Sequence, residues 1–317
     1  MKVNYNQIFL KNYWRSDILN KDLSYDVVND LLKFVLCELK EKNMSISHFR
    51  IQKTIFKIKM ELSQDHPLFD YLPFYWYEHG PFSNVVSKQF RELKNNNCIQ
   101  YSSHTFFLDD KSFNDFSKEN QLIDEYPIIN SISDRIFEDS NLFFNKFDED
   151  IYLDYAPFNF MHPFKYVLYE TTRDDDLFSS FVSDNYLNVF YDCLSNLPYD
   201  NLLIDFSVLF SRLFSRLELL NDENQFLNNW VYIIQPVQLS WLTFARWVRI
   251  YDHDTFYNDN IGLWKNELKN HIKIFNNAVG KFEDKTKNIF NDSSYNPDYD
   301  SFEYQMLNAT IGNYLKD

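Results

Sequence analysis

The chain has 317 residues, which is enough for two domains, each with its own core. Its four glycines are scattered, which excludes the P-loop and the dinucleotide-binding fingerprint, because both need clustered glycines for close backbone approach. Three cysteines, Cys37, Cys98 and Cys193, lie far apart and form no CxxC pair. They therefore predict neither a zinc site nor a disulfide framework.

The net charge of −15 is unevenly distributed along the chain. Residues 1–110 hold 14 Lys and Arg against 13 Asp and Glu, a net of +1. Residues 111–317 hold 17 against 33, a net of −16. Because phosphate contacts dominate DNA affinity, any DNA contact is expected from the near-neutral N-terminal part. The acidic remainder suits a basic partner protein, because complementary charge steers association.

The sequence favours a cytoplasmic protein with no membrane segment. The first residues lack the apolar core of a signal peptide. The longest charge-free run, 224–245, contains several amides and a proline, and a lipid-facing helix would leave many of these polar groups unsatisfied. We expect two buried helices there, 224–235 and 237–251, hinged at Pro236.

Two helices are predicted near the start of the chain. Ser24 is expected to cap a helix over 25–41, and Ser47 a second helix over 48–62. The second helix has one apolar stripe, formed by Ile51, Ile55, Ile58 and Leu62. Lys53 and Lys57 lie on its opposite side, where they are candidates for contact with DNA or a partner.

A third helix follows the aromatic run 74–77. A structural turn is expected at His79, Gly80 and Pro81, and Ser83 is expected to cap the helix over roughly 84–94. Its inward face consists of Val86, Phe90 and Leu93. Its outward face carries short polar and basic side chains, namely Asn84, Ser87, Lys88, Arg91 and Asn95. Beyond it, Ile99–Leu108 reads as two short strands.

Together these elements predict a mainly α protein. A winged helix-turn-helix domain with a small β-wing is expected over 1–110, and an acidic all-helical domain over 111–317. The second domain is expected to contain helices at 177–195, 202–220, 224–235, 237–251, 259–279 and 300–315. In the clearest of these, Leu209, Leu213, Leu217 and Leu220 share one face. A homodimer through this helical domain is one possible arrangement.

The polar face of the third helix has two interpretations. A recognition helix needs short polar and basic side chains at i, i+3, i+4 and i+7, so that they reach base edges and phosphates together. The alternative is an ordinary solvated helix face, and Glu92 beside it favours that alternative.

Two short motifs resemble those of SocA-like (Panacea) antitoxin domains and YwgA-type proteins. Residues 50–56, Arg-Ile-Gln-Lys-Thr-Ile-Phe, are similar to the Lys-Leu-Gln-Lys-Leu-Leu-Tyr motif, and His79-Gly-Pro-Phe82 is similar to the Tyr-Gly-Pro turn. The resemblance covers roughly 45–108 and implies a non-catalytic domain that binds a toxin or acts as a regulator. The sequence departs from it at His79, at residues 54–55, and in its long helical C-terminal part.

No motif predicts an enzyme, a metal or a cofactor. The histidines form no HxxxH or HExxH pair, and the acidic stretches 148–150, 174–176 and 298–300 lack the spacing of an EF-hand loop. Adjacent residues such as Asp252 and His253 rarely face one another. Two functions remain open: a winged-helix regulator or antitoxin-like module, and a protein-interaction module or DNA-mimicking decoy that acts through the acidic helices without binding DNA.

Overall fold

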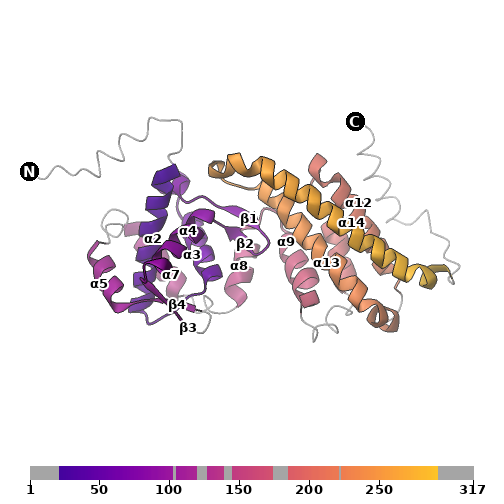
Figure 1. Ribbon diagram of the computed structural model, residues 1–317, viewed down its shortest axis with the longest axis horizontal. Coiled ribbons are helices and arrows are strands. Elements are labelled where there is room, and N and C mark those ends of the chain that lie inside the picture. Colours follow the sequence, from indigo (N-terminus) through magenta and orange to yellow (C-terminus); the bar gives the residue numbers. More distant parts are fainter. Residues whose placement is uncertain are drawn as a thin grey trace, which may run out of the picture. The chain divides into compact units, whose positions relative to one another are not determined.

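The computed structural model describes residues 21–102, 105–119, 127–138, 145–173, 185–220 and 223–291 (Figure 1). The fold is mainly helical with two two-stranded sheets, which confirms the predicted class. The chain forms two compact units. The first consists of residues 1–75, 79–151 and 253–259, and the second of 76–78, 152–252 and 260–317.

The first unit begins with α2 (Lys21–Glu41) and α3 (His48–Glu61). Ser47 caps α3 as predicted, since its hydroxyl accepts from the N–H of Arg50 at 3.3 Å. Ser24 is not the predicted cap. It is buried inside α2, which starts three residues earlier, at Lys21. Asp22 lies in the first turn of α2, where its negative charge interacts favourably with the helix dipole. The predicted stripe of α3 is buried in full, at Ile51, Ile55, Ile58 and Leu62.

The predicted third helix and strand pair are both present. α4 (Asn84–Asn95) begins at Ser83, whose hydroxyl accepts from the N–H of Val86 at 3.3 Å. β3 (Ile99–Ser102) pairs antiparallel with β4 (Thr105–Leu108). Ile46, between α2 and α3, forms an additional bridge to Phe106 of β4, with N···O distances of 3.0 and 2.8 Å.

The turn predicted at residues 79–81 begins one residue earlier than expected. β1 (Tyr75–Tyr77) and β2 (Gly80–Phe82) form a two-stranded sheet, and the turn residues are Glu78 and His79. Gly80, with a φ of 99°, and Pro81 belong to the strand. The turn is followed by a residue at positive φ, which glycine adopts without strain.

The predicted domain boundary near residue 110 falls within the first unit, which continues to Ile151. The polar stretch where the boundary was expected is a capped helix, α5 (Asp110–Glu119). Asp109 accepts from the N–H groups of Lys111 and Ser112 at 3.0 and 3.1 Å. α7 (Pro127–Glu138) and the first part of α8 (Asn145–Tyr155) complete this part of the unit.

A distant segment, His253–Asp259, belongs to the first unit. The N–H of Asp254 donates to the Phe74 carbonyl at 2.9 Å, and its carboxylate accepts from the Phe74 N–H at 2.5 Å. The same carboxylate lies 2.6 Å from the buried ammonium of Lys59. Tyr257 is buried beside Ser83 and Tyr75. The first unit therefore includes a segment that begins 102 residues after Ile151 (253 − 151).

The second unit is helical. Its main helices are α11 (Asn185–Ser195), α12 (Ile204–Glu218), α13 (Glu223–Tyr251) and α14 (Ile261–Asn291). Shorter turns are α9 (Met161–Pro163), the π-helical η3 (Phe164–Tyr169), and the 3-10 turns η4 (Glu170–Arg173) and η6 (Asn201–Leu203). The 3-10 turns η1 (Phe69–Tyr71) and η7 (Thr255–Asn260) lie elsewhere in the chain.

The helices of the second unit differ from prediction in two ways. α13 is a single helix with Pro236 inside it, so the predicted pair of helices hinged at Pro236 is wrong. Proline removes one N–H donor, and the helix continues on either side of it. The helix predicted at 259–279 extends to Asn291. The predicted stripe of Leu209, Leu213, Leu217 and Leu220 is buried as expected. The predicted helix at 300–315 and residues 177–184 lie outside the described residues.

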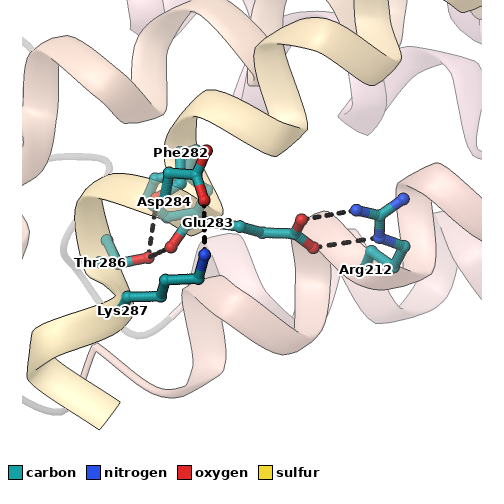
Figure 2. Close-up of polar contacts among 6 residues, drawn as sticks. All are labelled: Arg212, Phe282, Glu283, Asp284, Thr286 and Lys287. Atoms are coloured by element: carbon teal, nitrogen blue, oxygen red, sulfur yellow. Dashed lines mark hydrogen bonds and ion pairs between the residues drawn. The ribbon is translucent and has the colours of Figure 1, made fainter. Parts of the chain in front are cut away.

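An ion pair between Arg212 and Glu283 joins two helices of the second unit (Figure 2). Arg212 of α12 donates to both carboxylate oxygens of Glu283 on α14, at 3.0 and 2.5 Å. One turn on, Lys287 pairs with Asp284 at 2.8 Å, and the Thr286 hydroxyl donates to the Phe282 carbonyl at 2.8 Å. Across the described ranges, no helix is both long and apolar enough to cross a membrane.

Candidate nucleic-acid interface

The start of α4 is held in place by Gln52 of α3. The buried side-chain amide of Gln52 accepts from the N–H of Ser83 at 2.9 Å and donates to the Ser83 carbonyl at 3.1 Å. It also donates to the Ser87 hydroxyl at 2.8 Å. One side chain thus satisfies the N–H of the capping residue, adds a second bond to a carbonyl that already accepts the Ser87 N–H at 3.1 Å, and orients the first turn of α4.

Tyr257 holds the same helix end from another side. Its hydroxyl accepts from the N–H of Asn84 at 3.1 Å and lies 3.3 Å from the Ser83 hydroxyl. It donates to the Pro73 carbonyl at 3.4 Å. Burial raises the pKa of Tyr257, so the phenol stays protonated and can keep donating. The segment His253–Asp259 therefore positions the start of α4.

The predicted polar face of α4 is on the surface. Asn84, Lys88, Arg91 and Asn95 are exposed, and Ser87 is half-buried. The ammonium of Lys88 lies 4.2 Å from the ring centre of Tyr25, close enough for a cation–π contact that does not consume its charge. We call these five residues the α4 face. They form one patch with no buried charge among them.

Lys94 adds a third cation beside the α4 face. It is exposed, and its ammonium lies 5.5 Å from the ring of Phe106 and 5.7 Å from the ring of Tyr101 on the β3–β4 hairpin. The ring of Tyr101 is itself 55% exposed. The hairpin thus presents an aromatic side chain next to a basic one.

The two lysines predicted on α3 are not part of this surface. Lys53 is buried and lies 2.7 Å from the Asp148 carboxylate, so it is used inside the first unit. Lys57 is half-buried, with its ammonium 5.6 Å from the Phe147 ring. Both were predicted to face outward because they lie opposite the apolar stripe, but Phe147 and Asp148 of α8 lie against them.

The predicted structural turn is partly a surface feature. Gly80, Pro81 and Ser83 are buried, whereas His79 is exposed. The His79 ring packs edge-on against Phe49, with centroids 5.5 Å apart. Phe49 is 55% exposed at the first turn of α3.

His48 is a residue of this region that the sequence did not single out. Its Nε2 lies 3.4 Å from the Ser87 hydroxyl, and its ring packs on Phe90 at 5.3 Å. Burial lowers the pKa of His48, and the positive charge of Arg91 lowers it further. The imidazole is therefore neutral near pH 7.

The sequence contains an indication that Gln52 has a structural role, and it contains none for Tyr257. A polar residue next to Ile51 in a buried stripe must find hydrogen-bond partners, although the pattern does not say which. Tyr257 lies 173 residues from its partner Asn84, and only the folded chain brings the two together.

In the parts of the chain that the structure describes, no three His, Cys, Asp or Glu side chains gather as metal ligands would. Asp148 pairs with Lys53, and His253 lies 3.2 Å from the Asn258 side chain. The acidic stretches 174–176 and 298–300 lie outside the described residues. No family model matches the chain, and neither a curated protein nor a solved structure resembles it significantly.

Proposed function

We propose that the chain is a non-enzymatic binding protein whose first unit is a winged helix that contacts duplex DNA through α4. The observation that carries the proposal is the α4 face, where Asn84, Lys88, Arg91 and Asn95 are exposed together. Short amides read base edges and basic groups hold phosphates, and one helix face presents both.

The order of elements supports the same proposal. A first helix, a residue bridged to the hairpin, two further helices and a β-hairpin occur in the order expected of a winged helix, with η1 and the β1–β2 sheet inserted between α3 and α4. In this arrangement α4 is the recognition helix and β3–β4 is the wing. Lys94 and Tyr101 place a cation and an aromatic ring where the wing meets α4.

Charge favours a second candidate, a protein-binding module. The residues of the first unit include 18 Lys and Arg against 24 Asp and Glu, a net of −6. Such a unit repels DNA at long range and attracts a basic protein. An antitoxin-like module or a decoy would use the same unit with a basic partner protein in place of DNA.

A salt series separates the two candidates. DNA binding through Lys88, Arg91 and Lys94 should weaken with salt at a slope of about −3 in a plot of log K against log salt. Lys88→Glu with Arg91→Glu should abolish binding and leave the circular dichroism spectrum unchanged. The matched control is Lys111→Glu with Lys118→Glu, two exposed residues of α5 that change the net charge equally.

The outcomes are distinct. Equal loss of DNA binding in both double variants would mean that net charge, not the α4 face, determines binding. If the wild-type chain binds no DNA at low salt, the DNA proposal fails. Capture of a purified basic protein that is lost on charge reversal at Lys88 and Arg91 would then support the second candidate.

A further inference from the structure

His48 and Ser87 form a hydrogen-bonded pair at the edge of the α4 face. The Ser87 oxygen already accepts from the Gln52 amide at 2.8 Å. A hydroxyl has one hydrogen to donate and two lone pairs to accept. With the imidazole neutral and its proton on Nδ1, the hydrogen of Ser87 points to His48 Nε2, 3.4 Å away.

Protonation of His48 reverses this bond. The imidazolium Nε2 is then a donor, so Ser87 accepts from both Gln52 and His48. Its hydroxyl hydrogen is released to point outward, on the face that also carries Lys88 and Arg91. The same event places a positive charge beside Arg91. A phosphate at this edge would gain one donor and one charge.

We propose that His48 is a further binding residue of the α4 face and that it takes up a proton when the face binds the phosphates of a DNA duplex. The inference rests on the proposed function and specifies its partner as a polyanion.

The charged surroundings of His48 decide the direction of the effect. Arg91, from α4, opposes the protonation of His48 in the free protein. A phosphate that binds Arg91 cancels that opposition and adds an attractive charge, so the pKa of His48 rises on binding. The neighbouring titratable group, His79, reaches Phe49 rather than Ser87.

Proton linkage determines whether DNA affinity rises or falls with pH. Because the complex holds more protons than the free components, DNA affinity rises as pH falls. A pKa rise of about one unit gives at most about a tenfold gain in affinity across the window between the two values. A basic partner protein would have the opposite dependence, since it disfavours a positive charge at His48.

The test is fluorescence anisotropy with a labelled mixed-sequence duplex of about 30 base pairs at low salt, at about pH 8 and about pH 6. Wild type should bind several-fold more tightly at the lower pH. His48→Gln should lose this gain, because the amide can hydrogen-bond to Ser87 but cannot titrate. His79→Gln, an exposed histidine of the same unit, should keep it. The pKa of His48, followed by nitrogen-15 NMR, should rise when the duplex is added.

Each result has a separate meaning. Wild type that fails to bind the duplex at either pH overturns this inference and the DNA proposal together. Binding that is independent of pH, or a pH gain that survives His48→Gln, overturns the role of His48 and leaves the DNA proposal standing. A gain lost in His79→Gln assigns the proton to the hairpin turn and overturns the inference.

Discussion

The pairing of Lys59 with Asp254 predicts that two substitutions in one ion pair have very different effects. The ammonium of Lys59 is buried and lies 2.6 Å from Asp254, whose side chain is 35% exposed. Asp254→Ala removes the partner and leaves a buried charge against the Phe69 ring, 4.7 Å away. Lys59→Met removes the charge and keeps an apolar stem of similar length.

The expected magnitudes differ by more than 2 kcal/mol. A buried charge left without its partner costs about 3–5 kcal/mol of unfolding free energy. Asp254→Ala also removes the acceptor of the Phe74 N–H, which is held at 2.5 Å. After Lys59→Met the carboxylate still accepts that bond and still reaches water, so the loss is about 1 kcal/mol.

Hydrogen exchange with mass spectrometry measures the effect locally. Peptides over α3 and over residues 253–259 report the free energy of opening of the first unit, where a whole-chain transition would mix two units. Asp259→Ala is the matched control. It belongs to the same segment and pairs with Lys21 at 2.8 Å, but both side chains are exposed, so exchange should be unchanged. Equal effects of Asp254→Ala and Lys59→Met would refute the argument that the buried Lys59 charge, left without its partner, causes the larger loss.

Three further predictions concern packing, ion pairs and pH. Gln52→Ala should lower the free energy of unfolding of the first unit by about 1–3 kcal/mol, because it leaves the buried N–H of Ser83 without its acceptor, whereas the Ser83 carbonyl keeps the Ser87 N–H; hydrogen exchange over α4 tests this, and a loss under 1 kcal/mol would contradict it. Arg212→Ala should cost about 1 kcal/mol or less and matter least at high salt, since the arginine is 43% exposed; a salt-independent loss would point to packing instead. Burial and the nearby Arg246 lower the pKa of His271 below its usual 6.5. The unfolded chain therefore binds more protons than the folded chain, and the free energy of unfolding falls as the pH drops below 6.5. His271→Gln should flatten that fall, as measured by thermal melts over a pH series.

Local patterns were sufficient to predict α2, α3, α4 and the β3–β4 pair of the first unit. Ser47 and Ser83 cap helices because a hydroxyl before an amphipathic run satisfies free N–H groups, and this signal lies within a few residues. The strand pair Ile99–Leu108 was likewise predicted correctly from its composition. These predictions depend on neighbours in the sequence, which are also neighbours in space.

The errors have a common physical cause. Lys53 looks like a surface residue until Asp148, 95 positions later, lies against it. The stretch after Asp109 looks like a domain boundary because its polar residues are counted without its helix cap. Pro236 looks like a hinge, although a helix tolerates the loss of one donor when its two sides stay packed. In each case the deciding partner is remote in sequence or is a backbone group.

The use of basic residues inside the first unit limits how the α4 face can bind. Lys53 and Lys59 are neutralised by Asp148 and Asp254, so neither adds to an external field. On a unit of net −6, three exposed cations provide little counterion release. The proposed DNA contact must then draw its affinity from base edges read by Asn84 and Asn95. Such a protein binds mixed-sequence DNA measurably at low salt and weakly at physiological salt, where the contacts of Asn84 and Asn95 decide between sequences, and protonation of His48 adds a charge beside this face.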